Sequence, residues 1–396
     1  MNKFLASAAA AALLAGAAHA QEDPVRIGVL LSFTGPIESL TPAMASGAEL
    51  ALSEVSGDEN FLGGRTVEPV RADATCIDAG AATTAAERMV NSDRVSGIMG
   101  ADCSGVTTAT LTNVAVPNGM VMISPAATSP GLTGIEDNGL FFRTAPSDAR
   151  QGEVLAQILM EKGIEDVAVT YTNNDYGKGF SDAFAGAFEG MGGTVTLNTA
   201  HEDGKADYAA EVGALASAGG DALVVLGYVD QGGAGIVRGA LDTGAFDMFA
   251  FGDGMIGDNL TDAFGEDIAG SVGTAPGSEN EGGAVFADMA EAEGIDGTSV
   301  YAGESYDAAA LILLAMAAAG SADPADYAGG IMDVANAPGE AILPGDLSRA
   351  LQIIADGGEV DYVGASGVEL VDPGEAAGSY AEYEVVDGSL EVVGYR

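Results

Sequence analysis

The sequence predicts an α/β protein of two lobes, each a mostly parallel sheet flanked by helices. Short runs rich in Val, Ile and Leu alternate with longer segments of helical spacing, with a period of roughly 25–30 residues. This alternation is typical of parallel strands joined by right-handed helical crossovers. It restarts after "FFRTAPSD" at 141–148, and a chain of 396 residues exceeds what one core usually holds. Two successive units of similar size therefore indicate two lobes.

The first unit begins with the apolar run "VRIGVLLS" at 25–32, which predicts a buried strand. A turn at Thr34-Gly35-Pro36 follows, and then a helix at 41–55, where the small and apolar residues recur on one face. The same reasoning continues the unit with strands at 66–72, 95–100 and 120–125 and helices at 81–90 and 104–114.

The second unit is predicted from the same alternation of strand and helix patterns. Its helices are expected at 152–162, 176–191, 208–217 and 235–241, and its strands at 166–172, 194–200, 222–228 and 248–253.

The last part of the chain holds two predicted helices, 283–294 and 305–319, and the second is apolar enough that we expect it in the core and not in a membrane. Gly and Pro gather at 270–283 and 373–378, which favours connectors there. Near the end, "YAEYEVV" and "SLEVVGY" flank Asp387-Gly388, which predicts a β-hairpin.

Residues 1–20 are typical of a secretory signal peptide. Lys3 precedes an almost unbroken run of apolar and small residues, and Ala18-His19-Ala20 supplies an A-x-A cleavage site. We expect an exported, soluble protein without a lipid anchor, because no cysteine follows the cleavage site.

The charge balance restricts the partners. Fourteen Lys and Arg face 59 Asp and Glu, a net charge of −45. Such a surface repels nucleic acid and anionic membranes, which excludes both as partners. A solvated acidic surface suited to a salty environment explains the charge better than cation binding does. No cofactor motif is evident, and the acidic loops lack EF-hand spacing, so neither a cofactor nor a metal is expected.

"MGADCSG" at 99–105 places a cysteine beside a serine, which raises the question of a nucleophile. Only His201 would remain after signal cleavage, and it lies in the polar run "HEDGKADY". A nucleophile needs a base within hydrogen-bond reach, so no enzyme activity is expected. Cys76 and Cys103 are the two cysteines, and an even number in an exported chain suggests a disulfide.

Several polar residues follow predicted strands, where parallel sheets bind ligands. Each has an ordinary alternative explanation: a helix N-cap for Ser104, a turn for Thr128, rim packing for Tyr176 and Tyr228, and the acidic background for Asp253. Because all would lie at the same edge of the two sheets, they suit a zwitterion; they are Ser104, Thr128, Tyr176, Tyr228 and Asp253.

Five stretches resemble the periplasmic leucine/isoleucine/valine-type binding proteins of ABC importers. They are "IGVLLSFTGP…ASGAELALSEV", "MGADCSGVTTATLTNVAVPNGMVMISPAATSPGLT", "FFRTAPSDARQG", "NDYGKGF" and "SYDAAAL". The resemblance implies a type I Venus-flytrap fold with three hinge crossovers. It places one lobe at 24–146 and 277–375 and the other at 147–276 and 376–396.

Position by position, the resemblance also implies roles for individual residues. Cys76 and Cys103 match the disulfide cysteines of the family. The ligand carboxylate would lie on Ser104 and Thr128. The ammonium group would contact the backbone carbonyl of Ala126 and the carboxylate of Asp253. The aromatic or polar walls around the ligand would be Tyr176, Tyr228 and Tyr301.

Three positions depart from the family pattern. Leu40 stands where some members carry tyrosine, Asp253 is one methylene shorter than the usual glutamate, and Asp102 adds a carboxylate beside the serine that would bind the anion. That carboxylate either disfavours an anion or faces away from it.

The implied function is capture of an α-amino acid, aliphatic in preference, by a monomeric periplasmic protein that delivers it to an inner-membrane ABC permease. Two alternatives remain open: the same importer role with an aromatic carboxylate, amide or urea-like ligand, and a ligand-sensing receptor component. An exported hydrolase using Ser104 is the least supported class, because a base is lacking.

Overall fold

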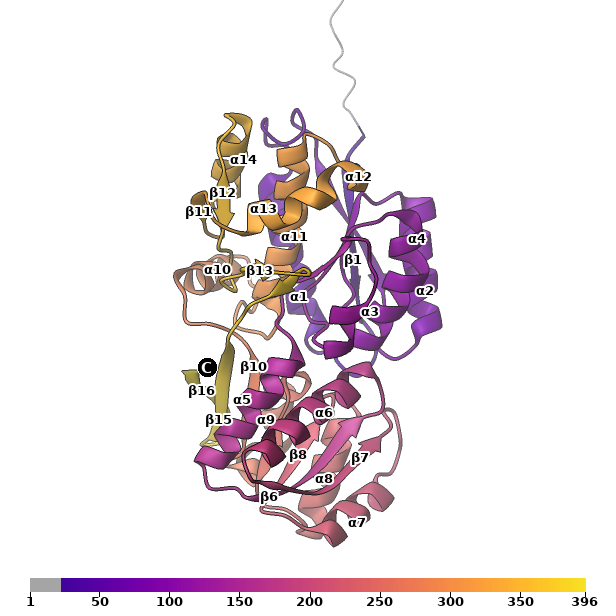
Figure 1. Ribbon diagram of the computed structural model, residues 1–396, viewed down its shortest axis with the longest axis vertical. Coiled ribbons are helices and arrows are strands. Elements are labelled where there is room, and N and C mark those ends of the chain that lie inside the picture. Colours follow the sequence, from indigo (N-terminus) through magenta and orange to yellow (C-terminus); the bar gives the residue numbers. More distant parts are fainter. Residues whose placement is uncertain (1–22) are drawn as a thin grey trace, which may run out of the picture.

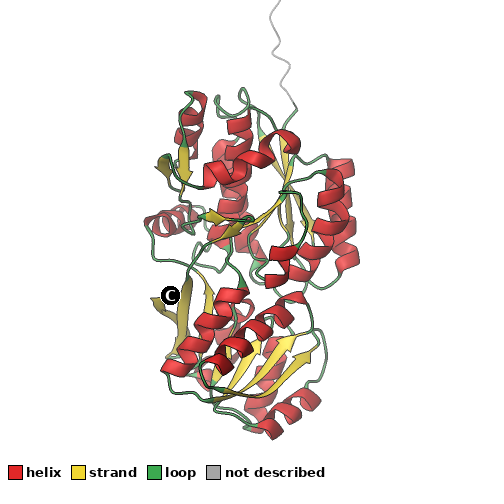
Figure 2. Cartoon of the chain, viewed as in Figure 1, coloured by secondary structure: helices red, strands yellow, loops and turns green. Residues whose placement is uncertain are grey.

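The computed structural model describes residues 23–396, which form two lobes arranged along the longest axis of the molecule (Figure 1). Each lobe contains a seven-stranded sheet with helices on both faces (Figure 2). The predicted α/β class with two mostly parallel sheets is confirmed. The proposed signal segment 1–20 lies outside the described residues.

The sheet of the first lobe has the strand order β13-β14-β5-β4-β3-β1-β2. All of its pairs are parallel except β13 with β14. Its strands are β1 (Val25–Leu31), β2 (Val67–Asp73), β3 (Gly97–Gly100), β4 (Met122–Ser124), β5 (Phe141–Arg143), β13 (Leu370–Val371) and β14 (Glu375–Ala376). The helices that follow the first strands are α1 (Thr41–Val55), α2 (Ala79–Arg88), α3 (Ser104–Thr110) and α4 (Val116–Asn118). Two π-helical segments, Met89–Asp93 and Leu111–Ala115, extend α2 and join α3 to α4.

The sheet of the second lobe has the order β16-β15-β10-β9-β8-β6-β7, with β15 and β16 antiparallel to their neighbours. Its strands are β6 (Asp166–Thr172), β7 (Thr194–His201), β8 (Ala222–Leu226), β9 (Phe249–Phe251), β10 (Val272–Pro276), β15 (Tyr380–Val386) and β16 (Ser389–Tyr395). Its helices are α5 (Asp148–Glu161), α6 (Asp175–Gly190), α7 (Ala209–Ala218), α8 (Gly232–Thr243) and α9 (Asp258–Phe264), with 3₁₀ turns at Asp253–Met255 and Gly265–Ile268.

The remaining elements complete the first lobe and its far end (Figure 1). They are α10 (Glu281–Ala292), α11 (Ala302–Ala319), α12 (Pro324–Tyr327), α13 (Ile331–Ala335), α14 (Leu347–Ala355), the parallel pair β11 (Glu340–Ile342) and β12 (Val360–Tyr362), and 3₁₀ turns at Pro130–Gly134 and Ala328–Gly330.

The chain passes between the two sheets three times: after β5, after β10 and after β14. These are the three crossovers that the fold class implies. The lobe boundaries that the resemblance places at 146/147, 276/277 and 375/376 stay a prediction.

Helix α11 is the central helix of the first lobe, and it packs on α1. Among the described residues it is the one helix long and apolar enough to cross a membrane by length and composition. Most of it is buried inside the protein, and Asp307 on it accepts hydrogen bonds from the Tyr362 hydroxyl and from Ser366. A helix anchored in this way belongs to a protein core, as its sequence predicts.

Two stretches differ from the sequence prediction. The sequence predicts a connector at 270–283, but this region contains β10, which lies between β9 and β15. All five residues of β10 are buried, so the strand shows no alternation of apolar and polar residues, and its small residues resemble a loop. Likewise, β14 lies within 373–378 and pairs with β5 through Glu375 and Arg143. The predicted hairpin is present, with Asp387 and Gly388 both at positive φ.

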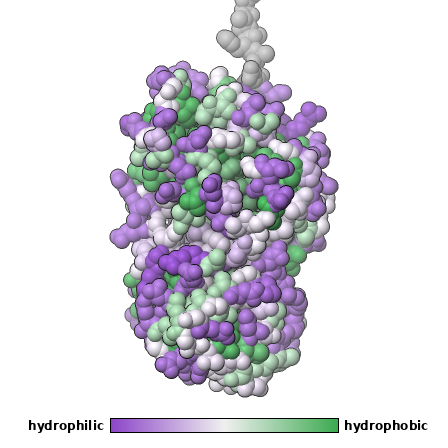
Figure 3. Space-filling model, in the orientation of Figure 1, coloured by the Kyte–Doolittle hydropathy of each residue, from purple (hydrophilic) through white to green (hydrophobic). Residues whose placement is uncertain are grey.

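Hydrophilic residues are spread over both lobes on the face shown in Figure 3, and apolar residues occur there in scattered groups. This distribution agrees with a solvated surface on this face.

Candidate ligand-binding cleft

A small cavity lies between the two lobes at the carboxyl ends of the parallel strands. Its volume is about 20 Å³, close to the space that one or two water molecules need. The first lobe contributes Ile37, Leu40, Asp102, Cys103, Ser104, Ala126 and Tyr301, and the second contributes Tyr176, Tyr228, Asp253 and Gly254. Six of the seven ligand-binding residues predicted from the sequence are therefore brought together. The seventh, Thr128, is buried two residues beyond Ala126 and does not line the cavity.

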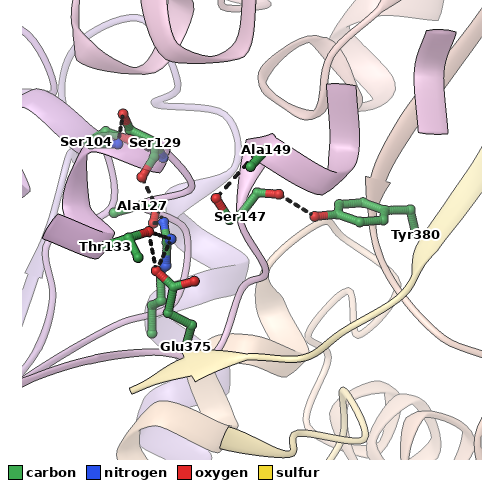
Figure 4. Close-up of polar contacts among 10 residues, drawn as sticks. Ser104, Ala127, Ser129, Thr133, Ser147, Ala149, Glu375 and Tyr380 are labelled. Carbon is green, nitrogen blue, oxygen red and sulfur yellow. Dashed lines mark hydrogen bonds and ion pairs between the residues drawn. The ribbon is translucent and has the colours of Figure 1, made fainter. Parts of the chain in front are cut away.

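Ser104 is the first residue of α3, which follows β3 after a short loop. Its side chain is buried, and its hydroxyl oxygen accepts a hydrogen bond from the backbone N–H of Ser129 at 3.1 Å (Figure 4). The hydroxyl proton remains free to be donated to a ligand. Ser129 in turn donates through its own hydroxyl to the carbonyl of Asp175 in the second lobe, at 2.9 Å.

The loop "SPAATS" that carries Ala126 and Thr128 is held from two sides. Ser124 accepts a hydrogen bond from the N–H of Ala127 at 2.9 Å. Arg143, which is fully buried, donates to the carbonyls of Ala127 and Ser129 at 3.1 and 2.9 Å. The loop geometry therefore depends on a buried cation.

Arg143 is itself neutralised by Glu375 of β14, at 2.5 Å (Figure 4). Arg143 lies within "FFRTAPSD", and the sequence patterns predict no role for it. A single arginine inside an otherwise apolar run was the available sign, since charged residues are buried only when they are paired.

Asp253 forms the opposite wall, at the start of the 3₁₀ turn after β9. Its carboxylate is 2% exposed and accepts a hydrogen bond from the Tyr176 hydroxyl at 2.9 Å and another from the Tyr301 hydroxyl. Burial raises the pKa of Asp253, while these two hydroxyls lower it. Burial and the charge of Asp253 raise the pKa values of both tyrosines well above their usual range, so both remain donors.

The aromatic walls come from both lobes. Tyr176 stacks on Tyr228 with a centroid distance of 5.3 Å and an interplanar angle of 19°. Tyr301 caps α11 with φ of +68°, a left-handed conformation that is uncommon for a residue with a side chain. Such strain is often found at functional sites, and here it accompanies a tyrosine that reaches from the first lobe to Asp253.

Asp102 faces the end of β1 and is fully engaged there. Its oxygens accept hydrogen bonds from the N–H and hydroxyl of Ser32 at 2.6 and 2.7 Å and from the N–H of Cys103 at 2.8 Å. Burial raises the pKa of Asp102, and these hydrogen bonds lower it. The sequence leaves open whether this carboxylate disfavours an anion or faces away from it. In the structure the carboxylate is directed to Ser32 and Cys103.

Cys103 forms a disulfide with Cys76, which ties the start of α3 to the loop before α2. The sulfur beside Ser104 is therefore not a nucleophile. His201 lies on β7, where its ring shares a 2.8 Å hydrogen bond with Thr170, and burial lowers its pKa to about 4. It does not line the cavity and gives Ser104 no base.

The two lobes also touch directly beside the cavity. Asp230 of the second lobe accepts a hydrogen bond from the N–H of Ser39 at 2.8 Å, and its own N–H donates to the carbonyl of Pro36 at 3.2 Å. Asn259 holds the other oxygen of Asp230 at 2.6 Å. Together with the bond between Tyr301 and Asp253, these contacts describe a closed arrangement of the lobes.

A larger cleft of about 640 Å³ lies on the other side of Leu40, lined by residues of α1, α9 and the region 294–300. Leu40 lines both spaces and separates them. It also lies close to Gly257, where a Cβ would stand 3.2 Å from a Leu40 methyl carbon.

Known proteins resemble this chain over most of its length. A family model described as "Periplasmic binding protein" matches residues 24–338. "Leu/Ile/Val-binding protein homolog 3" of Brucella melitensis is 32% identical over 259 residues, which are 64% of this chain and 68% of that protein. "Chemotactic signal transduction system substrate-binding protein BasB" of Halobacterium salinarum is 27% identical over 93% of this chain and 89% of that protein.

Among solved structures, the leucine-binding protein LivK of Thermotoga maritima superposes with a TM-score of 0.78 and 25% identity, covering 94% of this chain and 98% of that one. These relatives are binding proteins and not enzymes, in agreement with a site that lacks a nucleophile and a base. The chain belongs to the periplasmic binding protein family and, within it, to the leucine/isoleucine/valine type.

Proposed function

We propose that this protein is exported to the periplasm and captures an α-amino acid with an aliphatic side chain for an ABC importer. One observation carries the proposal: the hydroxyl of Ser104 from one lobe and the carboxylate of Asp253 from the other line the same cavity. A zwitterion needs donors for its negative end and an acid for its positive end, and the two walls supply them separately.

The ligand carboxylate would be bound by Ser104 and Thr128, and the ammonium group by the carbonyl of Ala126 and by Asp253. The side chain would contact Ile37 and Leu40, which are apolar. Neither a lysine nor an arginine occurs among the described residues that line the cavity. These features favour an aliphatic side chain over an acidic one.

Lobe closure explains how binding is coupled to transport. A cavity of about 20 Å³ does not admit an amino acid, so the lobes must separate to take one up and would close around it less tightly than they do here. We propose that they move about the crossovers near 146/147, 276/277 and 375/376. Ligand contacts with both lobes would then shift the population toward the closed form, which the permease recognises.

A thermal-shift screen tests the ligand class, because a ligand that binds the folded state raises its Tm. Protein that has been unfolded and refolded to remove bound solutes is screened against the twenty amino acids, aromatic carboxylates, amides and urea. We expect the largest shifts with leucine, isoleucine, valine or alanine. A shift with benzoate or urea and none with any amino acid would overturn the proposed ligand.

A second candidate function is ligand sensing, favoured by the similarity to BasB, a chemotactic substrate-binding protein. The two roles differ in the partner of the closed form. Loss of amino-acid uptake after deletion of the gene supports transport; loss of chemotaxis toward the amino acid with uptake unchanged supports sensing.

A further inference from the structure

Asp148 is a buried acid close to the cavity that the proposed site does not use. It is the first residue of α5, just after the first crossover, and its side chain is fully buried. Neither of its carboxylate oxygens has a hydrogen-bond partner among residues 23–396. Buried acids are normally paired or hydrogen-bonded, so this group needs an explanation.

The surroundings of Asp148 point toward the ligand. Its backbone N–H donates to the carbonyl of Thr128 at 2.9 Å, which places it against the loop that carries Ala126. The Thr128 hydroxyl, also buried and unpartnered within the described chain, lies near enough to lower the pKa of Asp148, although the two groups do not meet the geometry of a hydrogen bond. Asp253 lies near enough for its charge to raise that pKa. The unpartnered Asp148 carboxyl and Thr128 hydroxyl thus lie near each other and near Asp253 of the cavity wall.

Nearby cations do not account for Asp148. Arg143 contributes an attractive charge, but its two terminal nitrogens are occupied by the carbonyls of Ala127 and Ser129, by Thr133 and by Glu375 (Figure 4). Its Nε has no hydrogen-bond partner in the described part of the chain, so it does not bond to Asp148 either. The contrast with Asp307 is informative, since that equally buried acid accepts four hydrogen bonds from Tyr362, Ala365 and Ser366. Asp307 has a structural role that Asp148 lacks.

We infer that Asp148 is a second acid for the ligand's ammonium group, which it holds together with Asp253. This inference rests on the proposed function. It also explains why an aspartate can stand at 253. The side chain of Asp253 is one methylene shorter than the usual glutamate, and the carboxylate of Asp148 supplies a second acid for the ammonium group. The inference also narrows the ligand class to solutes with a primary ammonium group, which excludes urea, amides and benzoate.

The inference carries a consequence for protons. Burial, and then the charge of Asp253, raise the pKa of Asp148 well above its usual range, which favours its protonated form in the free protein. The other titratable groups that face it are Asp253, Arg143, Tyr176, Tyr301 and Tyr380. The three tyrosines stay neutral, because their pKa values are raised further. An ammonium group that binds beside Asp148 would lower this pKa again, so binding would release protons.

Calorimetric titration with L-leucine, L-isoleucine and L-alanine, in buffers of different ionisation enthalpy, tests this in the wild type, Asp148→Asn and Asp253→Asn. We expect release of protons on binding in the wild type and a loss of affinity of about tenfold or more in Asp148→Asn, with most of the proton release gone. The ligand-free Tm of Asp148→Asn should be unchanged or higher, because no hydrogen bond is lost. A structural role would instead lower Tm and affinity together.

Thr128→Val and Thr110→Val form a matched pair. Both threonines are buried with hydroxyls that have no partner in the described part of the chain, but Thr110 lies six residues beyond Ser104 and away from the cavity. Only Thr128→Val should weaken binding. Wild type that binds none of the three amino acids would refute the proposed function. Wild type that binds them, with unchanged affinity or unchanged proton release in Asp148→Asn, would refute this inference alone.

Discussion

Replacing Asp253 with asparagine tests the central claim about the cleft. The substitution keeps the size of the side chain and removes the charge. A carboxylate has about four acceptor positions, and Tyr176 and Tyr301 occupy two of them. The ammonium group would use the remaining acceptor positions. The variant therefore loses the charge-assisted interaction with the ammonium group, while the contacts with the two tyrosines can persist.

Hydrogen bonds to charged groups contribute about 1.5–3 kcal/mol, which corresponds to an affinity loss of about 10- to 160-fold. Calorimetric titration with L-leucine measures this loss directly. Asp262→Asn is the control, because it removes the same charge from an exposed residue of α9 that does not line the cavity. A loss of less than about threefold in Asp253→Asn, or an equal loss in the control, would refute the assignment of Asp253 to the ammonium group.

Three further predictions concern the protein as a whole. Changing both Cys76 and Cys103 to serine should lower the free energy of unfolding by about 3.5 kcal/mol, from a loop of 27 residues in the chain-entropy model, measured by guanidinium denaturation; an unchanged midpoint contradicts it. Asp230→Ala should speed ligand dissociation about two- to fivefold in stopped flow, because it removes a solvent-exposed bond to Ser39 that joins the closed lobes; an unchanged rate would show that this contact does not hold them. Raising KCl from 0.1 to 1 M should raise Tm, since screening reduces the repulsion within a chain of charge −45, and a falling Tm would contradict that account.

Much of the fold follows from patterns that the sequence displays openly. The strands at 25–31, 166–172 and 222–226 are apolar runs, and the helix Thr41–Val55 has one small and apolar face. Strand β10 was missed because its buried, small residues carry no periodicity. Pairing across long separations, such as Glu375 with Arg143, is set by tertiary packing and leaves no local pattern.

The candidate site was predicted unevenly for a similar reason. Residues at strand ends, such as Ser104 and Asp253, are found by position in the α/β alternation. Asp148 was missed, because it stands at the start of a helix in an acidic chain, where an aspartate is unremarkable. Only the burial of its two unpartnered oxygens distinguishes it.

The ties around the first and third crossovers have a mechanical consequence. In the first lobe, Arg143 and Glu375 are paired both through the backbone ladder and through their side chains, just before the two segments leave. In the second lobe, the Tyr380 hydroxyl donates to the carbonyl of Ser147 at 2.7 Å, just after the two segments arrive (Figure 4). The two crossover segments are thus held together at both ends. A pair of segments held in this way bends about one axis but resists torsion, so the lobes would close along a single path and meet in the same register each time.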